Sequence, residues 1–427
     1  MTQQPVNVYE VDGMTPVKVA APQTLSDLSD VLRGCSADRL AAIPWGGGSR
    51  MQLGNLPRRY DVAIDVTGLN RIVEYQPADL TVIVQAGVSI SALQAALAEK
   101  RQRLAFDPPY ARTATVGGSL ASNAVGPLRS TFGGVRDLVI GMKVVQGTGT
   151  VTKSGGKVVK NVSGYDLMRP HIGAIGTLGV IVETAFKLVP MPHASAAVAG
   201  GFDSLESARS ACVALLRAPF QPERFICATG DIAGRIGAAL GEPPGSSRFV
   251  VLAQLAAGEK AVARMTRTSL DTLKKYGPAW SNSMDGPADP LWGCLDPALD
   301  SPPALSMRAT MKPVPAFEFL DSLATKDDPA RGGSVLHVGF GTVLSHWSHP
   351  EDAPPGSLTE RARAVVEQAR AQARPHGVTV VVERCSVALK KEIDVWGEPQ
   401  AAGIMRNMKK QYDPGDVLSP GRFVAGI

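Results

Sequence analysis

Short apolar runs alternate with an amphipathic segment at the start of the chain, a pattern typical of strands joined by a helix. The runs VKVAA (17–21) and AAIPW (41–45) predict buried strands, and TLSDLSDVLRGC (24–35) between them has helical spacing. Thr24 and Ser26 are both suited to cap the start of this helix. The pattern therefore predicts a strand, a helix and a second strand that leads directly into a glycine-rich turn.

Later segments predict a further helix and then a series of strands and helices. The segment 89–104 predicts a helix, because Ile90, Leu93, Leu97 and Leu104 fall broadly on one face. From about Pro190 to Cys385, short strands alternate with helices. The clearest strands are ERFICAT (223–229), RFVVLAQLA (248–256), ALSMRATM (304–311), SVLHVGFGTVL (334–344) and VTVVVERC (378–385). This order predicts an α+β fold whose second part is an antiparallel sheet covered on one face by helices.

The glycine-rich turn after the second strand, GGGSR (46–50), is open to two interpretations. Three consecutive glycines lose much conformational entropy on folding, so a structured chain keeps them where the backbone needs positive φ or close approach. Such a turn can expose several amide groups to one anion, or it can be a flexible connection. A second glycine-rich stretch, 115–179, favours the anion site, although its spacing is not the GxGxxG of dinucleotide-binding βαβ units.

Composition and charge exclude several classes of protein. The net charge of +5 over 427 residues is small, and no basic run with interleaved aromatic residues indicates nucleic-acid binding. The N-terminal residues do not resemble a signal peptide and no apolar run is long enough to span a membrane, so we expect a cytoplasmic protein, at most peripheral to the inner membrane. The five cysteines form no CxxC pair, which argues against zinc, iron-sulfur and disulfide frameworks. They are Cys35, Cys212, Cys227, Cys294 and Cys385.

The order of the motifs resembles the FAD-binding domain of the vanillyl-alcohol oxidase or PCMH-type superfamily. The motifs are PWGGGSR (44–50), the stretch 115–149, KNVSGYDL (160–167), GTLGVIVE (176–183) and YDPGDVLSPGRF (412–423). IDVWGEP (393–399) and the terminal RFVAGI most resemble the E subunit of bacterial glycolate oxidases. The resemblance implies a two-lobed FAD-binding domain over 1–190, an α+β substrate or cap domain over 191–385, and a C-terminal segment, 386–427, that returns to the FAD domain.

The resemblance also implies which residues hold the cofactor. Gly46, Gly47, Gly48 and Ser49 would bind the FAD pyrophosphate through their amides, with Trp45 and Arg50 beside them. The flavin would be lined by Thr115, Val116, Gly117, Gly118, Ala121, Ser122 and Asn123, with Pro108 near the ring. Gly176, Gly179 and Ile181 would lie at the adenine end, and Arg422 at the end of the tail motif. Relatives that bind flavin covalently use a histidine in the phosphate loop, and this loop has none, so non-covalent FAD is expected.

Candidate catalytic residues come from the second half of the chain. Related D-2-hydroxy acid dehydrogenases hold a metal with His-x-x-Gly-Asp-Gly-Asn-x-His and a later Glu, and the corresponding HVGFGTVLSH retains His337 and Gly341 but not the Asp or the Asn. No metal site is therefore predicted. His337 and Glu383 are candidates for a base and its orienting group, or His337 is a core histidine. Arg308 grips a substrate carboxylate or faces water at a sheet edge.

The resemblance implies partners as well. With no cysteine cluster and no nicotinamide fingerprint, electrons would leave the flavin to oxygen, to a soluble acceptor or to another subunit. The resemblance favours other subunits: a second flavoprotein and an iron-sulfur protein. The sequence thus predicts an FAD-binding subunit of a complex that oxidises glycolate, D-lactate or another small 2-hydroxy acid. Two alternatives remain open at this point: a stand-alone FAD oxidase or dehydrogenase of an alcohol or sugar acid, and a non-catalytic assembly subunit. His171 either touches the flavin edge or packs against the adjoining loop.

Overall fold

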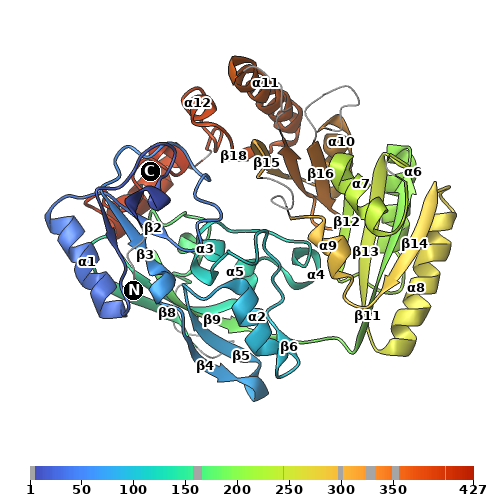
Figure 1. Cartoon of the computed structure of the whole chain (residues 1–427), viewed down its shortest axis with the longest axis horizontal. Helices are drawn as coiled ribbons and strands as arrows, with labels where there is room; N and C mark the ends of the chain where they lie inside the picture. The colour runs from blue at the N-terminus through green and yellow to red at the C-terminus, as the bar shows by residue number, and fades with distance from the viewer. Residues whose placement is uncertain are drawn as a thin grey trace. The chain divides into compact units, whose positions relative to one another are not determined.

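The chain divides into two units, each assembled from segments that are far apart in the sequence (Figure 1). The computed structural model describes residues 5–156, 166–243, 245–296, 302–323, 332–348, 355–399 and 401–427, so most of the KNVSGYDL motif lies outside the described residues. Unit 1 comprises Met1–Val125, Gly133–Met191 and Lys390–Ile427. Unit 2 comprises Gly126–Phe132 and Pro192–Leu389. Relative to the expected boundaries, a short excursion at 126–132 joins the second unit and the C-terminal segment begins at 390.

Unit 1 contains a parallel and an antiparallel sheet. The parallel sheet has the order β1-β3-β2 and consists of β1 (Lys18–Ala20), β2 (Ala42–Trp45) and β3 (Val62–Asp65). The antiparallel sheet has the order β4-β5-β9-β7-β8 and consists of β4 (Ile72–Gln76), β5 (Thr81–Gln85), β7 (Val139–Val145), β8 (Val151–Gly155) and β9 (Val180–Lys187). A small pair joins β6 (Gln102–Arg103) to β10 (Val189–Pro190). The helices of this unit are α1 (Leu25–Ala37), α2 (Ile90–Ala98), α3 (Val116–Ala121), α5 (Val135–Leu138) and α13 (Ala402–Tyr412).

The first two helices begin where the sequence indicates, but the second ends earlier than predicted. Thr24 caps α1 in a reciprocal capping box: the amide of Asp27 donates to the Thr24 hydroxyl at 3.1 Å, and the Thr24 amide donates to the Asp27 carboxylate at 2.9 Å. Helix α2 stops at Ala98, and Arg101 adopts a left-handed φ of 52° that ends the helical path. Leu104 is nonetheless buried in the same core as α2, because the chain folds back through β6.

Unit 2 is built on one eight-stranded antiparallel sheet with the order β14-β11-β13-β12-β16-β17-β15-β18. Its strands are β11 (Ala194–Phe202), β12 (Arg224–Thr229), β13 (Phe249–Ala257), β14 (Trp280–Asp285), β15 (Leu305–Thr310), β16 (Gly332–His337), β17 (Thr342–Trp347) and β18 (Val381–Arg384). Its helices are α4 (Arg129–Phe132), α6 (Leu205–Leu216), α7 (Gly230–Ala239), α8 (Glu259–Lys274), α9 (Asp289–Gly293), α10 (Pro313–Leu323) and α11 (Pro355–Ala373), and the short α12 (Val387–Lys390) crosses the boundary to unit 1.

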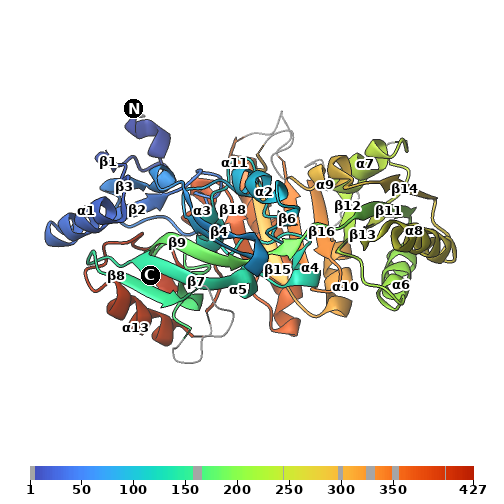
Figure 2. The same cartoon turned by 90° about the horizontal axis from the view of Figure 1, so that it is seen from below.

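Helices cover both faces of this sheet, not one as the sequence pattern suggested. Ile232 and Ile236 of α7 pack against Ile226 of β12. Cys227, the next residue of that strand, points the other way and contacts Cys212 of α6. Figure 2 shows the result, with α7 and α9 on one side of the sheet and α6 and α10 on the other.

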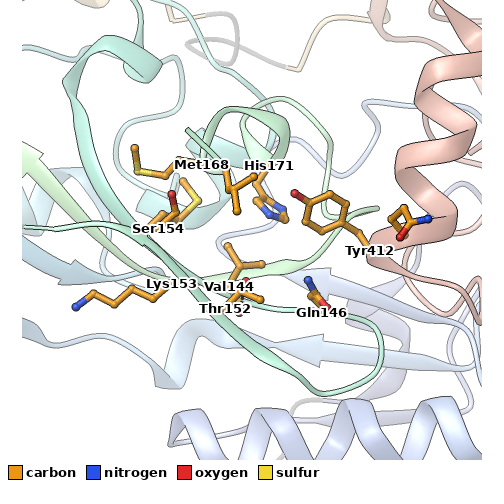
Figure 3. Close-up of a pocket in the computed structure, with 11 residues that line it drawn as sticks. Val144, Gln146, Thr152, Lys153, Ser154, Met168, His171 and Tyr412 are labelled. Carbon is orange, nitrogen blue, oxygen red and sulfur yellow. Dashed lines mark hydrogen bonds between the residues drawn. The ribbon is translucent and has the colours of Figure 1, made fainter. Parts of the chain in front are cut away.

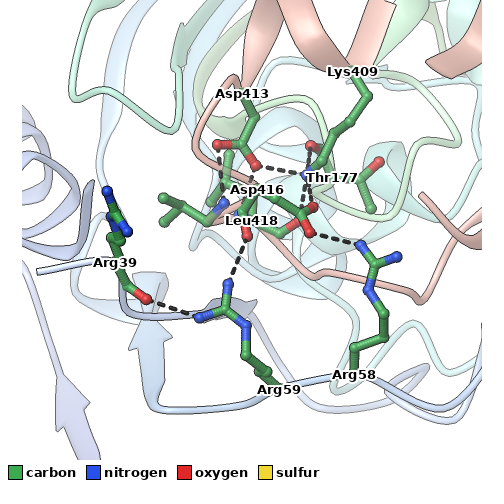
Figure 4. Close-up of polar contacts among 9 residues, drawn as sticks. Arg39, Arg58, Arg59, Thr177, Lys409, Asp413, Asp416 and Leu418 are labelled. Atoms are coloured by element: carbon green, nitrogen blue, oxygen red, sulfur yellow. Dashed lines mark hydrogen bonds and ion pairs between the residues drawn. The ribbon is translucent and has the colours of Figure 1, made fainter. Parts of the chain in front are cut away.

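The C-terminal segment is fixed to the rest of unit 1 by a network of charged side chains (Figure 4). The ammonium group of Lys409 donates to Asp413 at 2.6 Å and to the carbonyl oxygens of Thr177 and Leu418 at 3.0 and 2.8 Å. Asp413 in turn accepts hydrogen bonds from the amide of Leu418 at 2.7 Å. At the surface, Arg58 pairs with Asp416 at 2.6 Å. The buried part of this network satisfies both charges, which is the condition for tolerating a buried ion pair.

Candidate functional site

The glycine turn after β2 has no room for side chains. A Cβ atom on Gly46 would lie 2.3 Å from Oγ1 of Thr115, and one on Gly47 would lie 1.6 Å from the carbonyl oxygen of Thr113. Gly48 adopts a left-handed φ of 71°. The turn is therefore an ordered loop pressed against a second turn of the same unit, and the flexible-connection interpretation does not apply.

The amides of this loop are available to a ligand. Within the described part of the chain, no protein atom accepts a hydrogen bond from the amides of Gly47, Gly48 or Ser49. Gly47 and Gly48 are exposed. Successive amides that are free and directed outward form a concave site for an anion, and a phosphate group is the common occupant.

The second turn leads into α3 and supplies the facing wall. The Thr115 hydroxyl accepts a hydrogen bond from the Gly118 amide at 3.2 Å and so caps α3. The Gly117 amide donates to the carbonyl oxygen of Ala86 at 2.8 Å, and a Cβ on Gly117 would come within 2.7 Å of the Ala86 methyl group. These contacts hold α3 against the end of β5 and leave exposed Gly118 facing outward.

The two turns and the tail line one depression of about 70 Å³. The predicted cofactor residues that it brings together are Gly46, Gly47, Gly48, Ser49, Arg50, Thr115, Gly118, Ala121, Ser122 and Arg422. The remaining lining residues, Pro44, Met51, Leu53 and Ile175, were not predicted from the sequence. A signal existed for two of them, since Pro44 precedes the glycines directly and Ile175 lies within the GAIGTLG motif.

The other predicted cofactor residues do not line this depression. Val116 and Ile181 are buried in the core of the antiparallel sheet. Trp45 is buried, Pro108 is buried, and Gly117 packs on β5. Of the rest, Asn123 and Gly176 adopt positive φ angles of 45° and 77°, and a Cβ on Gly179 would lie 2.4 Å from the Val144 side chain.

Arg422 brings a buried positive charge to the depression. Its side chain donates hydrogen bonds to the carbonyl oxygens of Met51 and of Leu53, the latter at 2.8 Å, and its Nε has no hydrogen-bond partner in the described structure. Burial lowers the pKa of Arg422 below its usual range, although the guanidinium group remains charged at neutral pH. A buried cation beside free amides favours an anionic ligand.

His171 lies in a different cavity. That cavity has a volume of about 280 Å³ and is lined by β7, β8 and the end of α13, and it shares no lining residue with the depression (Figure 3). The ring of His171 meets the Tyr412 ring edge-on, with centroids 5.2 Å apart. Burial lowers the pKa of His171 from 6.5 to about 4, so the imidazole is neutral at physiological pH. These contacts correspond to the packing role, which was one of the two alternatives for His171.

The candidate catalytic residues belong to unit 2, where Arg308 and Glu383 lie on neighbouring strands. Nε of Arg308 on β15 lies 2.9 Å from Oε1 of Glu383 on β18. β15 is an interior strand, so Arg308 does not face water at a sheet edge. Glu383 therefore pairs with Arg308.

His337 ends β16 and is buried, with Nδ1 lacking a hydrogen-bond partner in the described structure. Burial, and then the nearby charge of Arg129, lowers its pKa from 6.5 to about 4. The guanidinium carbon of Arg129 lies 3.9 Å from the centre of the Phe340 ring. Leu344 of β17 pairs with both Arg308 and Val335, so His337, two residues beyond Val335, lies on the same face of the sheet as Arg308.

Comparisons with known proteins indicate which cofactor the chain binds. A family described as "FAD binding domain" matches residues 16–155, which include both turns. The chain carries an FAD-binding domain. The solved structure of p-cresol methylhydroxylase with substrate bound superposes with a TM-score of 0.69 at 17% identity, covering 95% of this chain and 88% of that protein. The fold is therefore of the PCMH type.

Two relatives match nearly the whole chain, and a third matches less than a third of it. Glycolate oxidase subunit GlcD of Bacillus subtilis (strain 168) is 25% identical over 424 residues, which cover 96% of this chain and 89% of the relative. D-2-hydroxyglutarate dehydrogenase of Xanthomonas citri pv. viticola is 26% identical over 96% of the chain and 89% of its own length. Glycolate oxidase subunit GlcE of Escherichia coli (strain K12) is 41% identical, but over 133 residues that cover 31% of this chain and 38% of the relative. This chain is an FAD-dependent oxidoreductase.

The residues present fit FAD. The free amides of Gly47, Gly48 and Ser49, with the buried charge of Arg422, would hold the pyrophosphate. Thr115 and Gly118 form the facing wall. No cluster of three or more potential metal ligands occurs in the described ranges, and none of the helices described there is long and apolar enough to cross a membrane.

Proposed function

We propose that this chain is the FAD-bearing subunit of a dehydrogenase complex that oxidises glycolate or another small 2-hydroxy acid and passes the electrons to partner subunits. The observation that carries the proposal is the cradle of free amides at Gly47–Ser49 beside buried Arg422, in a chain similar over nearly its whole length to a glycolate oxidase subunit. Two relatives are themselves named as subunits, which supports a complex. A second flavoprotein and an iron-sulfur protein are the partners proposed.

Unit 2 offers groups for a hydroxy acid. Arg308 would bind the carboxylate, because a guanidinium group matches its two oxygens. His337, held neutral by burial, would accept the hydroxyl proton at its unpartnered Nδ1. Bound FAD would supply the acceptor for the hydride. In this proposal Arg308 and His337 act from one face of the sheet on two ends of the same small molecule.

One observation favours a second candidate function. Glu383 already neutralises Arg308 at 2.9 Å, so a substrate carboxylate would have to compete with it. If it cannot compete, this chain relays electrons while a partner subunit oxidises the substrate.

Anaerobic titration of the purified flavoprotein tests both. We expect glycolate, D-lactate or a related 2-hydroxy acid to bleach the flavin absorbance, in the isolated chain or once partner subunits are added. Bleaching of the isolated chain supports the substrate site in unit 2, and bleaching only with partners supports the relay. No bleaching in the complete complex by any 2-hydroxy acid would reject the proposed substrate class.

A further inference from the structure

The start of the phosphate loop is held by the N-terminal arm, which we define as residues 5–14. The indole of Trp45, directly before Gly46, donates to the Tyr60 hydroxyl at 2.7 Å, and Tyr60 donates to the carbonyl oxygen of Tyr9 at 2.9 Å. The Tyr9 ring meets Trp45 edge-on with centroids 5.2 Å apart, and its hydroxyl donates to Asp65 at 2.7 Å. These contacts fix the last residue of β2 through a part of the chain that lies outside the matched FAD domain.

The end of the loop is held by the same arm and by the C-terminal segment. The ammonium group of Lys390 donates to the carbonyl oxygen of Gln52 at 2.6 Å and to both carboxylate oxygens of Asp12 at 2.9 and 2.8 Å. The side chains of this pair are 0% and 2% exposed. The guanidinium group of Arg422 donates hydrogen bonds to the carbonyl oxygens of Met51 and Leu53, on either side of Gln52. Three successive carbonyl groups are thus bound by two buried cations.

Fixed ends matter for a loop made of glycines. Glycine loses more backbone freedom on ordering than any other residue. A loop that is mobile before binding must lose this entropy when the ligand binds, and its affinity for the ligand is lower for that reason. Holding both ends before the ligand arrives reduces that cost, which is the general effect of preorganisation on affinity. Neither Lys390 nor Asp12 lines the depression, and Lys390 acts on it through the Gln52 carbonyl group next to Met51.

We propose that the buried pair of Lys390 and Asp12, with the N-terminal arm, braces the phosphate loop, and that Lys390 is a positioning residue for FAD. The proposal rests on the assignment of Gly46–Arg50 as the phosphate loop. The brace acts on the pyrophosphate part of the cofactor alone, so it controls affinity for any ligand that carries a diphosphate.

The test is the double variant Asp12→Leu with Lys390→Met in the full chain. Removing both charges avoids a lone buried charge, which favours retention of the fold, while the Gln52 carbonyl group loses its donor. We expect the Kd of the apoprotein for FAD, measured by quenching of flavin fluorescence, to rise on the order of tenfold. The Kd for ADP should rise by the same factor, and weak binding of riboflavin, which has no phosphate, should not change. The single variant Lys390→Arg, with Asp12 unchanged, keeps the charge and the donors. It should therefore retain part of the affinity that the double variant loses.

The control is Lys143→Met with Glu183→Leu, an ion pair of 2.7 Å in the antiparallel sheet of the same unit, whose residues do not line the depression. An equal loss of ADP affinity in this control, or unchanged FAD and ADP affinity in the double variant, would overturn the proposal. Should the double variant fail to fold, Tyr60→Phe removes the bond to Trp45 and must weaken ADP binding. Failure of the loop assignment is distinguishable, because Gly47→Ala would then leave ADP binding intact.

Discussion

Arg308 and Glu383 form an ion pair of 2.9 Å between two neighbouring strands of unit 2, with side chains only 14% and 10% exposed. A buried pair of this kind stabilises the sheet only while both partners are present. The same guanidinium group is the proposed receptor for a substrate carboxylate, so its exact shape matters as well as its charge.

Replacing Arg308 with Lys tests the receptor role. Lysine keeps the charge but loses the planar pair of donors, so we expect KM for the hydroxy acid to rise by roughly tenfold to a hundredfold, as for loss of one charge-assisted hydrogen bond. Flavin content should stay at the parent level, since Arg308 belongs to the other unit. Rates of anaerobic flavin bleaching against substrate concentration give KM, and an unchanged KM would remove Arg308 from the substrate site.

Gly47→Ala should abolish retention of FAD. The added methyl group would lie 1.6 Å from the carbonyl oxygen of Thr113, so the loop must move away from the facing turn and its amides lose their common direction. The measurement is the ratio of flavin to protein after gel filtration. Gly34→Ala, in the interior of α1 with open space around its Cβ, is the control and should keep FAD while adding about 0.5–1 kcal/mol of stability.

His337 makes unit 2 sensitive to acid. Its pKa is about 4 in the folded protein against 6.5 in the unfolded chain, so the unfolded state binds the proton first. The stabilisation is complete above pH 6.5 and declines as the pH falls towards 4, by about 2 kcal/mol at pH 5. His337→Leu should flatten this part of the pH profile of urea unfolding. His376→Gln, at an exposed position, is the control, and equal profiles for His337→Leu and the parent protein would contradict the prediction.

Lys409→Met should destabilise unit 1. The substitution leaves the Asp413 carboxylate buried without its cation, at a cost of about 3–5 kcal/mol, and removes the donor to Thr177. Thermal unfolding followed by circular dichroism measures the loss. Arg33→Gln breaks an ion pair with Asp30 whose side chains are 65% and 63% exposed, and should cost less than about 1 kcal/mol.

The sequence predicted those features whose cause is local. The capped helix after Thr24 follows from side-chain chemistry within one turn, and the glycine loop follows from the backbone freedom that Gly46–Gly48 require. The helix over 89–104 was overextended, because Leu104 satisfies the helical period while lying in the same core by another path. Periodicity reports burial and not the route of the chain.

Long-range contacts had no signal of this kind. Gly47 is a glycine because of Thr113, a residue in a distant turn, and nothing in either segment indicates the other. Lys390 and Asp12 are 378 residues apart, and each alone reads as an ordinary surface charge. The pairing of Arg308 with Glu383 likewise depends on the order of strands in the sheet, which the alternation of apolar residues does not specify.

The short excursion at 126–132 has a practical consequence for anyone who would dissect this protein. Because the chain leaves and re-enters unit 1 twice and unit 2 once, no single cut yields either half intact. A fragment ending near 191 would lack the final 38 residues, 390–427, that complete its own half, and it would carry seven residues that belong to the other. The two units therefore have to be expressed and folded as one chain.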